Sequence, residues 1–170
     1  GGMHPDLDLS FYTGMLSFLK ASFPQVAIHG FSPPEIAFWA KKENKSIAWI
    51  ISELKAAGLD SIPGGGAEIL VDAVRSKVSP NKCPADEWLE VMATAHGLGL
   101  RTTATMMFGM GETMADRLEH LEKIRALQDE TGGFTAFIPW TYEPANTNLP
   151  APEVSSWECL RFLARSRLYR

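Results

Sequence analysis

Cysteine is scarce in this sequence, and long apolar runs, a strong net charge and a secretory signal are missing. The two cysteines, Cys83 and Cys159, stand far apart and form no C-x-x-C pattern, which excludes a disulfide framework or a sulfur-rich metal site built by them alone. No apolar run approaches the roughly 18 residues that a membrane-spanning helix needs. The first six residues lack the charged and apolar regions of a secretory signal, so we expect a reduced, cytoplasmic protein without a membrane partner.

Charge and composition are those of an ordinary globular protein. The chain has 170 residues, with 16 lysines and arginines against 20 aspartates and glutamates, and a formal net charge of −4. This mildly acidic balance argues against nonspecific binding to nucleic acid or to an anionic membrane. With 45% apolar and 21% charged residues, the chain can fold around a core, and its length suits one domain or part of a larger one.

Short apolar segments alternate with longer segments of helical periodicity. Strands are predicted at 26–29, 60–63, 101–108 and 134–140. Helices are predicted at 9–23, from 33 onward, and at 46–57, 67–76, 84–97, 113–131 and 153–169. Phe11 and Phe18 are expected on the buried face of the first helix. Such alternation indicates right-handed β–α–β units around a parallel sheet, either an open, doubly wound sheet or a piece of a (β/α) barrel.

Parallel sheets bind ligands at the carboxyl ends of their strands, so the turn after each predicted strand is the place to look for a site. These turns are rich in polar side chains, glycine and proline. The side chains and glycines that they supply are His29, Ser32 and Glu35; Ser61, Gly64–Gly66 and Glu68; Gly109, Gly111 and Glu112; and Trp140, Tyr142 and Glu143.

Each of these candidates also has a purely structural interpretation. His29 suits a hydrogen-bonded core histidine, and Ser32 with Glu35 suits a helix capping box. Glu112 suits the positive end of the helix that follows it. The triplet Gly64–Gly66 suits a tight turn or a helix N-terminus that binds an anion, although it matches neither G-x-G-x-x-G nor the P-loop. The residues alone thus indicate a parallel α/β protein with a polar rim and do not choose a reaction.

Four segments of the chain together resemble one family of enzymes. They are FSPPEI (31–36), GLDSIPGGGAEIL (58–70), TTATMMFG (102–109) and QDETGGFTAFIPW (128–140). The family is that of the cyclic dehypoxanthinyl futalosine synthases (dehypoxanthine futalosine cyclases), radical S-adenosylmethionine enzymes of the futalosine route to menaquinone. The resemblance covers nearly the whole chain. Its SIPGGG segment favours this cyclase over the related aminofutalosine synthases and deazaflavin-cofactor synthases.

The resemblance implies a fold, cofactors and partners. The expected fold is α/β, a partial (β/α) TIM-type barrel with parallel strands. The expected cofactors of the full-length enzyme are a [4Fe–4S] cluster and S-adenosylmethionine, and the expected partners are a nucleoside-like small molecule and a reductant protein. In such enzymes a radical derived from the cofactor takes a hydrogen from the ribose of the substrate, which then closes onto its aromatic ring.

The resemblance also assigns roles to individual residues. Those that would bind S-adenosylmethionine are Gly1, Gly2, Thr105, Met107, Gly109 and Glu112. Thr105 and Met107 replace the glycine and isoleucine that are usual in this motif. Those that would bind the substrate are His29, Ser32, Glu35 and Glu68, and candidates for the catalytic acid or base are His29, Glu35, Glu68 and Tyr142. For Gly1 and Gly2 the alternative is a tag remnant in front of a start at Met3.

The cysteines that hold the cluster in this family are missing from the sequence. The family uses a C-x-x-x-C-x-x-C loop, and a [4Fe–4S] cluster is held by cysteine thiolates, which Cys83 and Cys159 cannot supply in sufficient number. We therefore expect no metal ligands here and no cofactor tightly bound to this chain alone. Residues 1–170 are expected to form one incomplete barrel domain, the central part of a longer enzyme, which is inactive by itself.

Two other interpretations stay open at this point. One is a non-catalytic nucleoside-binding module that lost its cluster. The other is an unrelated phosphate-binding α/β domain that uses Gly64–Gly66. A cysteine triad encoded upstream of Gly1 favours the enzyme, whereas a true start codon at Met3 favours the binding module.

Overall fold

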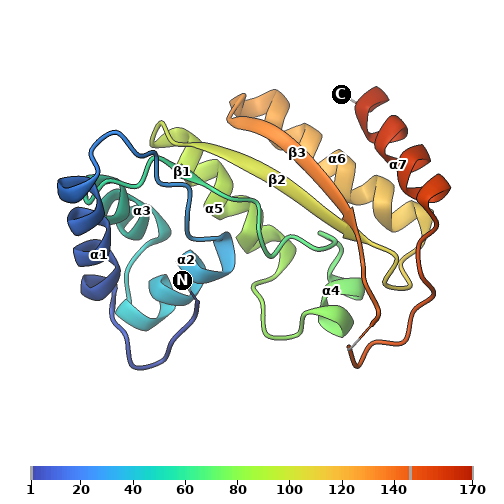
Figure 1. The fold of residues 1–170 in the computed structure, drawn as a ribbon, viewed down its shortest axis with the longest axis horizontal. Helices are drawn as coiled ribbons and strands as arrows, with labels where there is room; N and C mark the ends of the chain where they lie inside the picture. Colours follow the sequence, from blue (N-terminus) through green and yellow to red (C-terminus); the bar gives the residue numbers. More distant parts are fainter. Residues whose placement is uncertain (1, 146, 170) are drawn as a thin grey trace.

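Three helices open the chain, and from β1 onward each strand is followed by one or two helices (Figure 1). The computed structural model describes residues 2–145 and 147–169. Its strands are β1 (Ser61–Ile62), β2 (Arg101–Phe108) and β3 (Phe134–Thr141). Its helices are α1 (Leu9–Ser22), α2 (Pro33–Glu43), α3 (Ile47–Ala56), α4 (Asp72–Val78), α5 (Ala85–Gly97), α6 (Met114–Thr131) and α7 (Ser156–Leu168).

Local sequence signals explain where several helices begin and end. Thr113 accepts a hydrogen bond from the Asp116 N–H, and the Asp116 carboxylate accepts from the Thr113 N–H, so the two residues form a capping box at the start of α6. The same helix ends at Gly132, whose φ of 60° is left-handed. Ser46 caps α3 by accepting from the Trp49 N–H. These helix ends were predicted correctly because they depend on neighbouring residues only.

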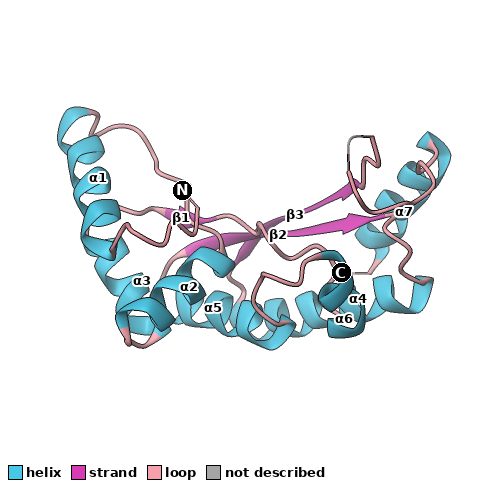
Figure 2. Ribbon diagram, turned by 90° about the horizontal axis from the view of Figure 1, so that it is seen from below, coloured by secondary structure: helices cyan, strands magenta, loops and turns pink. Residues whose placement is uncertain are grey.

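The three strands form one parallel sheet in the order β1–β2–β3. When neighbouring strands follow one another along the chain, right-handed crossovers place all their helices on the same face. Figure 2 shows this arrangement: helices α2–α6 lie under one face of the sheet, α1 and α7 rise at its two ends, and the other face has no helix over it. The three-stranded sheet is open, and its consecutive strand order is shared by a piece of a (β/α) barrel and by one half of a doubly wound sheet.

The core lies between the sheet and the helices. Alternate residues of β2, from Thr102 to Phe108, are fully buried on that side, and Trp39 and Trp88 fill the space between the helices. On the bare face Met107 is partly covered and stands opposite Trp140 of β3, whose side chain is 47% exposed. In a (β/α) barrel the face away from the helices is the packed interior, and ligands bind at the carboxyl ends of the strands.

Three predictions about local structure are wrong. Residues 26–29 do not form a strand: His29 makes one isolated bridge to Ser61. The helix predicted at 67–76 begins only at Asp72, after an irregular segment. Phe11 and Phe18 are 51% and 67% exposed, because α1 buries Leu9, Tyr12 and Leu16 instead. Among the described helices, none has the length and apolar character to cross a membrane.

Candidate functional site

Most of the predicted site residues gather at the carboxyl ends of the strands, but they fall into two separate groups. The first group, which we call the rim, lies around the segment after β1 and the carboxyl half of β2 and contains Gly2, Ser32, Glu35, Glu68, Thr105 and Met107. His29 stands apart from it, because its bridge partner Ser61 is level with Arg101, the first residue of β2. The second group lies between β2 and α7 and contains Gly109, Glu112 and Tyr142. The candidate Gly1 lies outside the described residues.

His29 occupies an exposed position beside β1. Its Nδ1 is 2.7 Å from the Ser61 hydroxyl oxygen, across the bridge that joins the two backbones. The neighbouring residue Ile62 is fully buried. His29 is thus not a buried core histidine, and its imidazole ring stays accessible to a ligand.

Glu35 joins the start of α2 to the N-terminal segment. One carboxylate oxygen accepts hydrogen bonds from the N–H and the hydroxyl of Ser32, each at 2.7 Å, so the predicted capping box is present. The other oxygen accepts from the Gly2 N–H at 2.5 Å, and the Tyr12 hydroxyl donates to the Gly2 carbonyl at 3.2 Å. The structural interpretation of Glu35 is therefore correct, and the same carboxylate places Gly2 at the rim.

Glu68 has the most unusual environment at the rim. Its φ of 40° is in the left-handed region, which costs a residue other than glycine on the order of 1–3 kcal/mol. The side chain is only 11% exposed, and one carboxylate oxygen lies 2.5 Å from Lys82 Nζ. The other oxygen is buried and has no hydrogen-bond partner among the described residues. Strain together with an unpaired buried oxygen is common at binding sites.

The glycine triplet has packing functions rather than an anion site. A Cβ on Gly64 would lie 2.6 Å from the Thr103 carbonyl oxygen, and the Gly64 N–H already donates to the Thr103 hydroxyl. Gly66 has a φ of 74°, and a Cβ there would lie 2.4 Å from Pro34 Cγ. No helix begins at the triplet, because α4 starts at Asp72. The structure thus contradicts the interpretation as a phosphate-binding helix N-terminus.

Two candidate residues of the rim donate hydrogen bonds to backbone carbonyls of the segment after β1. The Thr105 hydroxyl donates to the Gly64 carbonyl, and the Met107 N–H donates to the Glu68 carbonyl at 2.9 Å. The Thr105 hydroxyl is therefore already engaged, whereas the partly exposed side chain of Met107 remains available.

Glu112, in the second group, is fully enclosed. Its side chain has no exposed surface, and its two oxygens accept from the Gly109 N–H, the Met110 N–H and Arg117 Nε, each at 2.7 Å. Arg117 also lies 2.9 Å from Glu158 of α7. All partners of the carboxylate are thus protein groups, and Glu112 holds the β2–α6 loop.

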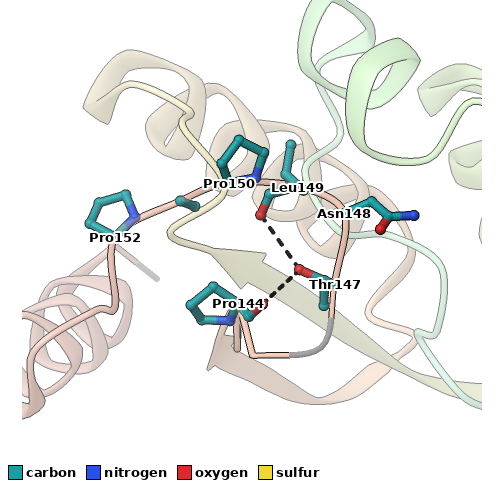
Figure 3. A pocket seen from close by; sticks show the side chains of 7 residues that line it. Pro144, Thr147, Asn148, Leu149, Pro150 and Pro152 are labelled. Carbon is teal, nitrogen blue, oxygen red and sulfur yellow. Dashed lines mark hydrogen bonds between the residues drawn. The ribbon is translucent and has the colours of Figure 1, made fainter.

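Tyr142 is enclosed by the loop that follows β3. Its hydroxyl contacts the Thr147 hydroxyl and donates to the Leu149 carbonyl at 3.2 Å. Figure 3 shows Thr147 hydrogen-bonded to the carbonyls of Pro144 and Leu149 inside this proline-rich loop. The hollow in the loop has a volume of about 610 Å³ but carries no ionisable side chain. Tyr142 therefore orders a loop rather than facing the rim.

A second hollow, of about 500 Å³, lies on the covered side of the sheet. Its walls come from β3, α6 and α7, and include Phe137, Gln128 and Tyr169. It is separated from the rim by the sheet itself, so we do not assign the predicted site to it.

The cysteines of this chain do not fit a metal centre. Within the residues that the structure describes, no three histidine, cysteine or acidic side chains come close enough to hold an ion. Cys83 and Cys159 are both free, and burial raises the pKa of the Cys83 thiol to about 11. A buried thiol of this kind is a poor ligand because metals bind the thiolate. Among the described residues, Cys83 and Cys159 thus form no thiolate group that could hold a cluster.

Several residues that shape the rim were missed by the sequence analysis. Lys82 pairs with Glu68, Arg75 is 3% exposed and donates to backbone carbonyls near Glu68, and His120 accepts from the Leu70 N–H. Arg75 and His120 lie on helices and have no motif around them. Only their burial and their contacts with the segment after β1 identify them.

His120 gives the structure a testable dependence on pH. Burial, then the charges of Arg75 and Lys123, lower the pKa of His120 to about 3 from 6.5, and its Nδ1 can accept from Leu70 only when the ring is neutral. The unfolded chain binds the proton below about pH 6.5 and the folded chain does not. The free energy of unfolding should thus fall by about 1.4 kcal/mol per pH unit from this residue as the pH decreases toward 3.

Urea unfolding at a series of pH values measures this contribution. We expect His120→Asn, which keeps a hydrogen-bond acceptor but cannot titrate, to flatten the acid limb of the stability curve. The matched control is His4→Asn, which changes an exposed histidine and should leave the limb as in the parent. Equal acid limbs for the parent and His120→Asn would contradict a neutral, buried His120.

Comparison with known proteins places this arrangement among enzymes. A scan against models of known protein families finds no match. The chain is 43% identical over 170 residues to a cyclic dehypoxanthine futalosine synthase of Streptomyces coelicolor, with 99% of this chain and 43% of the relative covered. It is 41% identical to an aminodeoxyfutalosine synthase of Thermus thermophilus, covering 99% of this chain and 46% of the relative. It is 38% identical to a 5-amino-6-(D-ribitylamino)uracil–L-tyrosine 4-hydroxyphenyl transferase of Methanopyrus kandleri, covering 99% and 47%.

These relatives are all named as enzymes, and the chain is similar to each of them over nearly its whole length. The resemblance to cyclic dehypoxanthine futalosine synthase is confirmed over nearly the full length of the chain. The chain spans less than half the length of the curated relatives that it matches. This homology contradicts the interpretation as an unrelated phosphate-binding domain.

Proposed function

We propose that this chain forms part of a radical S-adenosylmethionine enzyme that cyclises dehypoxanthine futalosine in the futalosine pathway to menaquinone. The observation that carries the proposal is the 43% identity to a cyclic dehypoxanthine futalosine synthase over 99% of the chain. The one-sided arrangement of the helices supports it, because a partial (β/α) barrel also has its helices on one face of a parallel sheet. An aminodeoxyfutalosine synthase activity is the second candidate, favoured by 41% identity.

In this proposal the rim faces the substrate. Glu68 presents its carboxylate at the rim beside the Lys82 ammonium, and His29 presents its ring beside β1. S-adenosylmethionine, when bound with a cluster held elsewhere in the protein, supplies the hydrogen abstraction. Gly2 and Met107 would lie beside that cofactor, whereas the enclosed Glu112 side chain would support it by holding the loop that contains Gly109. The alternative of a non-catalytic nucleoside-binding module shares this rim but converts no substrate.

The test compares substrates and two matched variants in the longest natural protein that contains this chain, reconstituted anaerobically with iron and sulfide. We expect turnover of dehypoxanthine futalosine with S-adenosylmethionine, followed by chromatography and mass spectrometry. Glu68→Gln should lower the turnover roughly tenfold or more, the equivalent of one lost hydrogen bond to a charged group. Glu130→Gln, an exposed position near the end of α6, should leave it unchanged.

Other outcomes decide between the alternatives. Turnover of an aminodeoxyfutalosine precursor instead would favour the second candidate, and nucleoside binding without turnover would favour the binding module. The 170-residue chain alone is expected to take up no stoichiometric iron and to show no cyclase activity, because it lacks the thiolates. A cluster absorption band from this chain would contradict that expectation.

A further inference from the structure

The segment between β1 and α4, residues 64–71, has no regular secondary structure and yet carries Glu68. A backbone without a helix or sheet ladder must satisfy its polar groups in another way when it is buried. Ala67, Ile69 and Leu70 are all fully buried. The groups that hold this segment therefore decide whether Glu68 can keep its strained, left-handed conformation.

Arg75 of α4 binds the first half of the segment. Its side chain is 3% exposed, and its guanidinium donates to the Gly66 carbonyl at 3.2 Å, to the Ala67 carbonyl, and to the Cys83 carbonyl at 2.5 Å. A buried guanidinium is tolerated only when its charge is compensated by hydrogen bonds. Arg75 thus joins the backbone before Glu68 to the loop that carries Lys82. Lys82 is the ion-pair partner of Glu68.

His120 and Lys123 of α6 bind the second half. The Leu70 N–H donates to His120 Nδ1 at 3.0 Å, and Lys123 Nζ donates to the Leu70 carbonyl at 2.7 Å. Residues 120 and 123 lie about one turn apart, so one helix holds both the N–H and the carbonyl of Leu70. Glu68 therefore sits between two fixed points, Ala67 and Leu70.

We propose that Arg75 and His120 are positioning residues, which hold the backbone on either side of Glu68 so that its carboxylate meets a donor group of the substrate. The proposal rests on the proposed function. Strain at Glu68 persists only if its surroundings over-determine it, and these contacts supply that constraint. The unpartnered oxygen of Glu68 is the group whose position they control.

A double-mutant cycle in the longest natural protein tests this role. His120→Phe keeps a ring but removes the acceptor, and should lower kcat/KM on the order of tenfold to a hundredfold, as expected for a displaced contact group. In the Glu68→Gln background the same change should have little further effect, because the residue it positions is already lost. His120→Asn restores an acceptor and should recover part of the activity. Ile124→Val, a buried change on the same helix that makes none of these contacts, is the control.

Amide hydrogen exchange gives a readout that does not need activity. His120→Phe and Arg75→Met should speed exchange at Leu70 and Glu68, whereas Ile124→Val should not. Equal losses of kcat/KM in both Glu68 backgrounds would overturn the positioning role, and so would unchanged exchange. If His120→Phe and Arg75→Met speed amide exchange but the parent protein converts neither futalosine substrate, the proposed function is overturned. The role of Arg75 and His120 in holding the backbone beside Glu68 is then retained.

Discussion

Replacing Glu112 by glutamine is expected to lower the free energy of unfolding by about 3–5 kcal/mol. The carboxylate has no exposed surface, and its oxygens accept two backbone N–H groups and Arg117 Nε. Glutamine keeps one acceptor oxygen for the Gly109 N–H and Arg117 Nε, but its NH2 group then faces the Met110 N–H, which loses its acceptor. Arg117 then loses the charge that compensates it, and the β2–α6 loop loses one of its two backbone contacts.

The matched control is Glu158→Gln, which touches the same guanidinium from the exposed side. The Glu158 side chain is 48% exposed, so its ion pair with Arg117 is screened by water and should contribute less than about 1 kcal/mol. Urea unfolding of both variants measures the difference. If Glu112→Gln keeps the parent's stability but weakens binding of S-adenosylmethionine, the direct cofactor contact that the family resemblance implies is favoured instead.

Local features of the fold were predictable because they depend on near neighbours. Strand β2 has the predicted bounds, Arg101–Phe108, and the Ser32–Glu35 capping box and the Gly132 helix end follow from adjacent residues. The parallel order of the strands follows from alternation and handedness. Whether the helices lie on one face or both was left open by the sequence, since that depends on strand order.

Tertiary contacts explain what was missed. Helical periodicity in α1 is satisfied by two faces, and only the packing against Phe31 and Trp39 selects Tyr12 over Phe11. The predicted strand at 26–29 fails because the Ile28 N–H donates to the Asp60 carboxylate instead of a strand partner. Neither contact joins residues close in sequence.

The candidate site shows the same division. Strand-end reasoning brought Glu35 and Glu68 to one rim, because carboxyl ends of parallel strands share an edge. It placed His29 there as well, whereas the structure puts His29 level with Arg101, the first residue of β2. It could not predict that both oxygens of Glu112 accept hydrogen bonds from protein groups. One of these groups is Arg117, whose side chain reaches back from the first turns of α6 to the loop. The contact between Glu112 and the buried Arg117, which sequence spacing does not reveal, distinguishes this supporting residue from the residues that face the rim.

Gly64→Ala is expected to destabilise the protein by about 3 kcal/mol, the upper end of the usual effect of overpacking. A Cβ at this position would lie 2.6 Å from the Thr103 carbonyl oxygen and 2.7 Å from Ala104 Cα. Both atoms belong to the backbone of β2, so no side-chain rotation relieves the overlap. The only remedy is to move residues 64–70 away from the sheet, which stretches the contacts of Gly64 with Thr103 and Thr105.

Gly30→Ala is the control, because a Cβ there meets nothing within 4 Å and its φ lies outside the left-handed region. It should leave the midpoint of urea unfolding unchanged or raise it, since alanine restricts the unfolded chain. Because the displaced segment carries Glu68, Gly64→Ala should also speed amide exchange there while Gly30→Ala does not. If Gly64→Ala unfolds at the same urea concentration as the parent, the segment is not packed against β2 as closely as the structure places it, and the support of Glu68 by the sheet is refuted.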